Sequence, residues 1–406
     1  MPRLLSALAA GSLLLMGSAL AERQPQQVSE QEAWALHSRV LTLDTHVDIG
    51  RGYATEQLDP GRFTSAQVDL PKMRAGGLDA AFFIVYVGQG GLTEQGFANA
   101  RQQAEESYQA IKRMTRAYPD QIGLARSADE VEALHAAGKL VALIGMENAY
   151  PLGESVAEIP LWAERGVRYV SITHMGHNQF GGSSNPRLDQ GDTPNQGLTE
   201  LGRALVKALN DNGIMVDVSH VGKKTMLEAI ALSRAPVIAS HSGVTAVHPN
   251  LRNLDDEQLT AIKTNGGVAQ MVAFRSYVAT VDPQIQKGQE ALRQQYLAAG
   301  WGGASEADVK AYTDGLTALR QLHQDVTLAQ FVDHIDYAVK HIGIEHVGIV
   351  SDFDGGGGVE GWDDATETIN VTWELMRRGY SEAEIRALWS GNVLRVMRAV
   401  AAAANQ

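Results

Sequence analysis

The sequence predicts an α/β protein whose strands close into a (β/α)8 TIM barrel, with long loops after the fourth and seventh strands. Two observations predict this fold class. Eight short segments along the 406 residues are almost continuously apolar, which is typical of parallel strands covered on both faces. Amphipathic helical stretches separate these segments, and eight strand-then-helix units favour a closed barrel. The pattern alone also permits an open doubly wound sheet.

The expected strands follow one another along the whole chain. The second and third consist almost wholly of apolar residues. Each of the last five contains Val or Ile, which suits a buried strand. Between strands, Gly96–Tyr118 and Gly197–Asn212 show the period of a helix. In chain order the strands are 41–46, 80–87, 140–146, 167–173, 214–219, 236–240, 267–273 and 346–351.

Two connections are unusually long. Residues 175–200, after the fourth strand, are rich in Gly, Ser, Asn and Pro, and residues 274–325, after the seventh, have a more helical composition. Loops that follow strands lie on the catalytic face of a barrel, so both are candidates for shaping a substrate site. For 274–325, a mobile insertion or a subunit contact explains the composition equally well.

The first 21 residues are expected to be a signal peptide rather than part of the fold. A basic start is followed by an apolar stretch, and Ser18-Ala19-Leu20-Ala21 gives the small-x-small pattern of a cleavage site. Cleavage would leave 22–406 as a single barrel domain, exported to the periplasm and without a membrane segment. An N-terminal membrane anchor is the weaker interpretation, because Gly11, Ser12 and Gly17 interrupt a stretch already at the short limit for spanning.

Charge and cysteine content exclude some classes of protein. Lys and Arg number 34 against 47 Asp and Glu, a formal net charge of −13. Such a chain lacks the basic surface that displaces counterions from nucleic acid, so we expect no nucleic-acid partner. It contains no cysteine. A zinc site would therefore be built from His, Asp and Glu, a set more typical of catalytic than of structural zinc.

Groups suited to metal binding or proton transfer stand at the ends of six expected strands. Any one of them has a simpler explanation, since a lone His is more often structural and a lone Asp often caps a helix. Together they would be costly to bury without a cation. The groups are His46, Asp48, Glu147, His174, His220, His241 and Asp352.

Imidazole and carboxylate ligands suit zinc, while Mn²⁺ and Fe²⁺ fit the same set. Two ions explain the groups better than one, because a carboxylate such as Glu147 can bridge them. Bridged ions lie about 3.5–4 Å apart and hold a hydroxide between them, which can attack an amide at neutral pH.

Several short segments together resemble the renal (membrane) dipeptidase family, peptidase family M19, among the amidohydrolase-like metallohydrolases. The similarity runs in order from about residue 41 to residue 395. The segments that carry it are Asp44-Thr45-His46-Val47-Asp48, Glu147, Thr173-His174, Ser219-His220, Ser240-His241-Ser242, Arg252-Asn253-Leu254 and Ser351-Asp352-Phe353-Asp354-Gly355.

The resemblance implies a zinc dipeptidase, a homodimer, and small peptide substrates that include dipeptides with a D-residue at the C-terminal position. It implies that His46, Asp48 and Glu147 hold one zinc ion, and that Glu147, His220 and His241 hold the other. It further implies that His174 binds substrate and stabilises the oxyanion. Arg252 would bind the substrate's carboxylate, and Asp352 would transfer the proton to the leaving amine.

One segment departs from the family pattern. The family's His-Pro-Arg-Asn appears here as His248-Pro249-Asn250-Leu251-Arg252-Asn253, and Arg252 is aligned because Asn253-Leu254 follows it. An arginine that caps a helix is the alternative. Hydrolysis of a lactone, cyclic amide or phosphoester on the same barrel also stays open, as does a non-catalytic zinc- or solute-binding protein. Of the nearby residues, we expect His177 to be solvated and Asp354 to be a structural partner.

Overall fold

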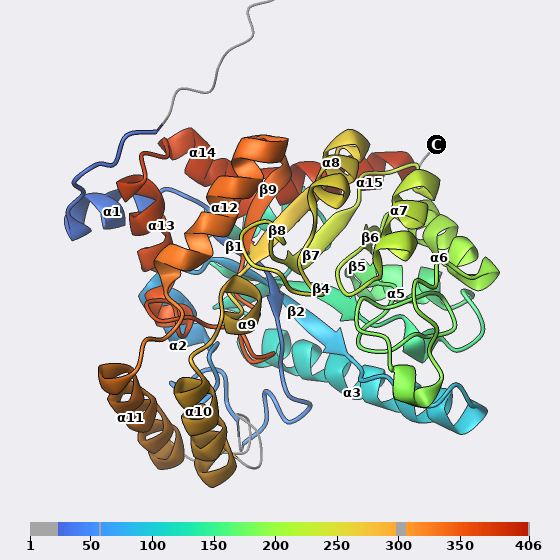
Figure 1. Ribbon diagram of the computed structural model, residues 1–406, viewed down its shortest axis with the longest axis horizontal. Coiled ribbons are helices and arrows are strands. Elements are labelled where there is room, and N and C mark those ends of the chain that lie inside the picture. The colour runs from blue at the N-terminus through green and yellow to red at the C-terminus, as the bar shows by residue number, and fades with distance from the viewer. Residues whose placement is uncertain (1–22, 57, 298–305, 405–406) are drawn as a thin grey trace, which may run out of the picture.

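Eight parallel strands form an almost closed barrel in the computed structural model, which describes residues 23–56, 58–297 and 306–404 (Figure 1). They pair in the order β1-β2-β4-β5-β6-β7-β8-β9. A parallel bridge from Val47 to Phe353 brings the first strand to the last, and the Asp48 amide donates to the Phe353 carbonyl at 2.9 Å. The predicted (β/α)8 fold is confirmed. The barrel strands are β1 (Leu43–Val47), β2 (Ala80–Tyr86), β4 (Leu140–Glu147), β5 (Val167–Ser171), β6 (Met215–Asp217), β7 (Ile238–Ser242), β8 (Val268–Val272) and β9 (Val347–Val350).

All eight expected strands overlap an observed one, with small shifts in their ends. The sixth begins and ends two residues later than expected, so that His241 lies within β7 instead of after it. A further strand, β3 (Ile122–Leu124), pairs only with β4 and lies off the barrel path. Three residues, of which only Ile122 is buried, are too few to give a periodic signal.

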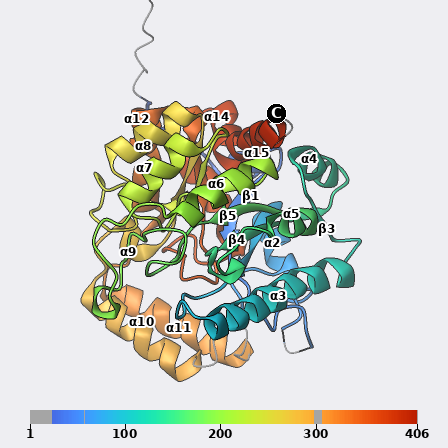
Figure 2. The same ribbon diagram turned by 90° about the vertical axis from the view of Figure 1, so that its right-hand side faces the viewer.

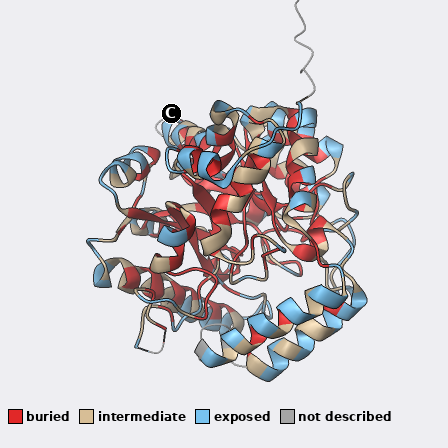
Figure 3. Ribbon diagram, turned by 90° about the vertical axis from the view of Figure 1, so that its left-hand side faces the viewer, coloured by how far each residue is buried: buried red, intermediate tan, exposed pale blue. Residues whose placement is uncertain are grey.

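Helices surround the barrel (Figures 1 and 2), and the strands inside them are buried while the outer helix faces are exposed (Figure 3). Capping explains where many begin: Ser, Thr or Asp side chains accept from the first turn of α1, α3, α4, α6, α8 and α12. The helices outside the second long connection are α1 (Glu30–His37), α2 (Leu70–Gly76), α3 (Glu94–Ala117), α4 (Ala128–Ala136), α5 (Ile159–Arg165), α6 (Glu200–Asp211), α7 (Lys223–Leu232), α8 (Asp256–Asn265), α12 (Leu328–Ile342), α13 (Thr368–Arg377), α14 (Glu382–Arg386) and α15 (Asn392–Ala404).

The long connection after β5 is irregular but tied down. Antiparallel bridges join Gly181 to Leu198 and Ser183 to Val221. The expectation of a solvated His177 is wrong, because this side chain is buried. One ring nitrogen accepts from the Ser183 amide at 3.0 Å, and the other lies 2.7 Å from the Thr193 carbonyl. His177 therefore holds the loop in shape.

The long connection after β8 contains α9 (Arg275–Val278), α10 (Pro283–Tyr296) and α11 (Glu306–Leu322). The last two lie side by side as a helical hairpin beside the barrel (Figures 1 and 2). Two arginines and two aspartates fasten the hairpin to the barrel loops. Arg275 and Arg320 each bind both Asp325 and Asp363 at 2.5–3.2 Å.

The predicted signal peptide, 1–21, lies outside the described residues. Within the described part of the chain, every helix is too short or too polar to cross a bilayer. Most of the buried apolar residues form one large cluster. A second cluster contains alternate residues of the strands, such as Phe82, Leu143 and Tyr169, together with residues of α15. The carboxyl ends of the strands are the exception, because His and Asp are buried there among apolar neighbours.

Candidate metal centre and active site

All seven predicted groups have ligand atoms close together at the carboxyl ends of the barrel strands. Glu147, the last residue of β4, lies at the centre. Its Oε1 lies 3.0 Å from Nε2 of His220 and 3.3 Å from Nε2 of His241, and its Oε2 lies 3.6 Å from Nε2 of His46. His46 Nε2 is also 3.5 Å from Asp48 Oδ2 and 3.9 Å from Asp352 Oδ1.

The hydrogen bonds around His46 fix which ring nitrogen carries the proton. The Tyr169 hydroxyl donates to the Thr45 carbonyl at 2.9 Å. That hydroxyl has one hydrogen, so it can only accept from His46 Nδ1, which lies 2.9 Å away. The lone pair of the neutral ring is then on Nε2, a buried atom with no hydrogen-bond partner among the described residues. Gly145 in β4 makes room for this arrangement, because a Cβ there would lie 2.3 Å from the Tyr169 ring.

His241 is oriented in the same way by a different pair. The Ser240 hydroxyl donates to Asp217 Oδ2 at 2.6 Å, and so it accepts from His241 Nδ1 at 2.8 Å. The lone pair of His241 is thereby placed on Nε2, only 2.8 Å from Nε2 of His220. Partners that orient a metal-binding imidazole from its other nitrogen are a general feature of metal sites.

This arrangement fits a cation. In the neutral rings, lone pairs on His46 and His241 face carboxylate oxygens of Glu147 at 3.6 and 3.3 Å in a buried setting. Electron-rich atoms at such distances repel one another unless a positive charge, from a metal ion or an added proton, lies among them. Three overlapping groups of ligand atoms lie within 4.8 Å of one another: His46, Glu147 and His241; Glu147, His174 and His220; and His46, Asp48 and Asp352.

Burial and neighbouring charges shift the pKa values of these groups strongly. Burial holds the pKa of His220 and of His241 well below the usual value, which keeps both rings neutral and able to donate a lone pair. Burial would also lower the pKa of His46, but the carboxylates of Glu147 and Asp48 hold it well above the usual value, so His46 is the imidazole that most favours a second proton when no cation is bound. A bound cation would favour the deprotonated form of every one of these groups.

The backbone is strained at two of the strand ends. His220 and Asp352 both have positive φ angles, 64° and 62°, which are uncommon for residues other than glycine. Asp44 supports the same region: its carboxylate accepts from the amides of His46 and Ser351. Burial raises its pKa to about 6. Strain of this kind concentrates at functional sites, where surrounding contacts maintain it.

A cavity of about 380 Å³ opens onto these groups. His174 lines it and is the most exposed of the imidazoles, with its Nε2 3.9 Å from Glu147 Oε1. Asp352 also lines the cavity, and burial raises its pKa well above the usual value. Tyr86, Phe274 and Tyr277 supply aromatic walls. Asp354, expected to be structural, accepts from the Gln67 and Val68 amides and also reaches the cavity.

Arg252 is buried beside this cavity, with its guanidinium 5.3 Å from the ring centre of Tyr277. Its Nη2 donates to the His241 carbonyl at 3.0 Å, while its buried Nε has no partner among the described residues. Among these residues no carboxylate forms an ion pair with it. A buried cation without a counterion is costly, so the site is suited to receive an anion.

The hydroxyl of Tyr169 gives a first prediction. In Tyr169→Phe the ring keeps its volume but His46 loses the partner that holds its proton on Nδ1. We expect metal affinity to fall about 10–100-fold, the usual cost of losing a partner of a ligand. Competition with a chelator measures this. Tyr150→Phe is the matched control, since the Tyr150 hydroxyl donates to the Gly91 carbonyl, away from the imidazoles. Equal affinities in the two variants would contradict the role of Tyr169.

A parallel barrel whose strand ends gather imidazoles around one buried carboxylate defines a metallohydrolase of the barrel class. The chain belongs to the membrane dipeptidase family, peptidase family M19, whose model matches residues 30–406. It is thus a dipeptidase of the metallopeptidase class, as the resemblance implied.

Known proteins agree with this assignment. The dipeptidase ataJ of Aspergillus terreus is 30% identical over 394 residues, covering 91% of this chain and 86% of the relative. The "probable dipeptidase PvdM" of Pseudomonas aeruginosa is 35% identical, with a TM-score of 0.80 over 92% of this chain and 98% of that one. A metallopeptidase of Rhodobacter sphaeroides, solved with a phosphinate mimic of the dipeptide L-Ala-D-Ala, shares the fold at 24% identity, with a TM-score of 0.68 over 89% of this chain and 99% of that one.

Proposed function

We propose that this chain is a dipeptidase with two zinc ions that hydrolyses free dipeptides, including those with a D-residue at the C-terminal position. The observation that carries the proposal is the convergence of three imidazoles on the two oxygens of Glu147. A carboxylate that has possible metal ligands beside each of its two oxygens is suited to bridge two cations. The ligand of the Rhodobacter protein supplies the first stereochemistry to test.

The ligands divide between two positions. His46 and Asp48 stand on the side of Oε2 of Glu147, and His220 and His241 stand on the side of Oε1. We assign the first pair to one zinc ion and the second pair to the other, with Glu147 shared. Bound zinc supplies Lewis acidity and lowers the pKa of water to about 7.

The remaining groups act on the substrate. His174, whose pKa burial lowers, is a neutral donor for the oxygen that becomes negative when the amide is attacked. Asp352 takes the proton of the attacking water and delivers it to the leaving amine nitrogen. Arg252, a buried cation without a counterion, binds the free carboxylate of the second residue.

Metal analysis and a substrate panel test this proposal together. We expect about two zinc ions per chain, hydrolysis of L-L and L-D dipeptides, loss of activity on chelation, and recovery when zinc is returned. Zinc is assigned if it restores activity better than Mn²⁺ or Fe²⁺. If no dipeptide of either stereochemistry is hydrolysed by the zinc-loaded protein, the proposal is wrong.

Arg252 provides a second prediction, which separates dipeptide hydrolysis from other reactions of barrel hydrolases. In Arg252→Met the side chain keeps most of its volume but loses the charge. We expect KM for free dipeptides to rise about 10–100-fold, as for loss of a charge-assisted hydrogen bond of 1.5–3 kcal/mol. The same dipeptide with a C-terminal amide, which lacks the carboxylate, should be affected little. Equal effects on both substrates would show that Arg252 only supports the wall of the site.

We further propose that the protein is exported and acts in the periplasm after removal of residues 1–21. The proposal rests on the apolar stretch and the Ser18-Ala19-Leu20-Ala21 pattern. The intact mass of the secreted protein tests it, because cleavage leaves Glu22 as the first residue. A mature chain that still begins at Met1 would contradict it.

A further inference from the structure

A groove adjoins the metal cavity and runs along α10 of the helical hairpin. The metal cavity and this groove, of about 500 Å³, share Phe274 and Gly355 in their walls. The groove in turn shares Arg275, Gln289, Arg293 and Gly356 with an inner pocket of about 120 Å³. Three hollows with common walls thus extend from the candidate ligands to α10.

Two glycines form the part of the wall where the cavity meets the groove. A Cβ at Gly355 would lie 2.2 Å from Asp48 Oδ2 and 2.4 Å from Asp352 Oδ1. A Cβ at Gly356 would lie 2.7 Å from the Phe274 ring. Side chains at these positions would therefore clash with the carboxylates or with the Phe274 ring. Glycine in the turn after β9 thus lets this wall pack closely between the metal cavity and the groove.

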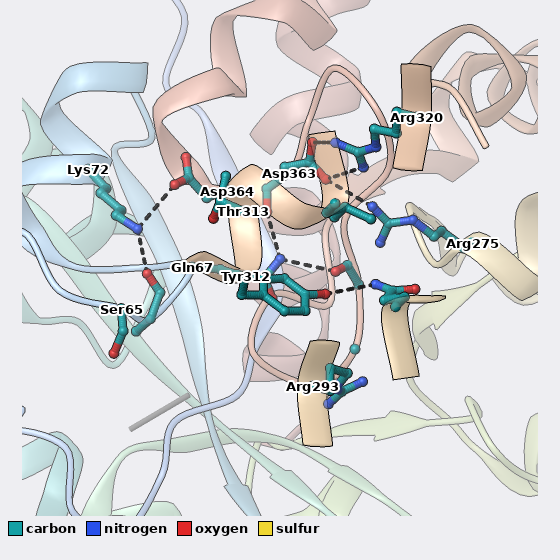
Figure 4. Close-up of a pocket in the computed structure, with 15 residues that line it drawn as sticks. Ser65, Gln67, Lys72, Arg275, Arg293, Tyr312, Thr313, Arg320, Asp363 and Asp364 are labelled. Carbon is teal, nitrogen blue, oxygen red and sulfur yellow. Dashed lines mark hydrogen bonds and ion pairs between the residues drawn. The ribbon is translucent and has the colours of Figure 1, made fainter. Parts of the chain in front are cut away.

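The cations around the groove and inner pocket fall into two sets. Arg275 and Arg320 bind Asp325 and Asp363, and Lys72 lies 3.1 Å from Asp364. These charges are compensated (Figure 4).

Lys287 and Arg293, on the hairpin helix α10, form no ion pair with any described residue. Figure 4 shows Arg293 at the edge of the pocket without a partner among the residues drawn. One acidic side chain in the groove, Glu290, is bound by Gln294 at 2.7 Å. The groove thus offers two available cations against one anion, in a chain of net charge −13.

We propose that this groove is an extended substrate subsite that binds an anionic extension on a dipeptide, with the negative group beside Arg293 and Lys287. The proposal rests on the dipeptidase function above. The occupant is part of the substrate rather than a separate ligand, because the groove adjoins the metal cavity, with Phe274 and Gly355 in the walls of both. A long acidic side chain would reach past Phe274 and Gly355 into the groove while its backbone stays at the metal centre.

Charge, length and position of the extension can be varied separately in a kinetic test. The probes are dipeptides of alanine and Nε-succinyl-lysine, with the modified lysine in the first or the second position. Their controls carry the uncharged succinamide in place of succinate. For the zinc-loaded wild-type protein, we expect kcat/KM to favour the succinyl probe about two- to fivefold in at least one position, as for one exposed ion pair. The preference should shrink at high salt.

Charge reversal on α10 locates the effect. In Arg293→Glu and in Lys287→Glu, we expect the ratio of succinyl to succinamide kcat/KM to fall to one or below. Lys263→Glu is the matched control: this exposed lysine of α8 lies outside the groove, and its reversal should leave the ratio unchanged.

The results of these experiments distinguish failure of the proposed subsite from failure of the proposed dipeptidase function. If the wild-type protein hydrolyses the uncharged probes and plain dipeptides but shows no charge preference in either position, the subsite is refuted and the dipeptidase remains. If Lys263→Glu lowers the ratio as much as Arg293→Glu, the preference reflects overall charge and the subsite is again refuted. If no dipeptide is hydrolysed, the proposed function fails and the subsite fails with it.

Discussion

Replacing Glu147 by Gln is expected to abolish most of the activity and to release metal. This carboxylate is the one group within 4 Å of all four imidazoles of the site. Gln keeps the shape of the side chain but removes the negative charge and the second anionic oxygen, so it cannot bridge two cations. We expect kcat/KM to fall by more than about 10³-fold, beyond the loss caused by removing a single transition-state donor.

Metal content and folding separate this effect from a general loss of structure. Elemental analysis of Glu147→Gln should find less than two metal ions per chain, while its circular dichroism should match the wild-type protein. Glu154→Gln is the control, because Glu154 is an exposed carboxylate a few residues further along the chain. A Glu147→Gln variant that kept both activity and metal would rule out the shared ligand, and with it the two-ion site.

The barrel and the place of its chemistry could be predicted because both are local in sequence. Continuous apolar runs mark strands covered on both faces, and a parallel barrel brings all carboxyl ends to one rim. Residues that end or directly follow the runs, such as His46, Glu147 and His220, therefore had to come together. Their final separations, 3.0–3.6 Å, follow from the fold.

The groups that orient these ligands could not be predicted, because their roles depend on distant strands. Tyr169 comes from β5 and acts on His46 of β1, 123 residues earlier in the chain. In the sequence it is one more aromatic residue of a buried strand. The role of Asp217 and Ser240 in orienting His241 could not be predicted for a similar reason. Serine and aspartate at a strand end usually suggest a turn or a helix cap. A sequence signal does exist for Gly145, an unexpected glycine inside a strand, which often marks a close approach.

The surface against which the helical hairpin packs could not be predicted from the sequence either. The composition of 274–325 indicates helices but not the surface against which they pack. What fixes them is an ion network whose members lie up to 88 residues apart, from Arg275 to Asp363. This network connects the hairpin to Asp363, in the loop that follows the Gly-rich turn, so the proposed subsite depends on it.

Replacing Asp325 by Asn is therefore expected to cause a large loss of stability. The Asp325 side chain is fully buried and binds Nε of both Arg275 and Arg320, whose own side chains are only 10% and 13% exposed. Removal of one member of a buried ion group leaves the others uncompensated, at a cost of about 3–5 kcal/mol. Urea unfolding should show this as a lower midpoint with little change in slope.

Asp314→Asn is the matched control, because it removes the same charge from the same hairpin at an exposed position. Asp314 pairs with Lys310 at 2.6 Å, with side chains 64% and 74% exposed, and such pairs contribute under about 1 kcal/mol. Equal losses in the two variants would mean that the buried network does not fasten the hairpin. If instead only Asp325→Asn is destabilised, it should also lose the preference for the succinyl probe, since Arg293 is carried on the hairpin that the network holds in place.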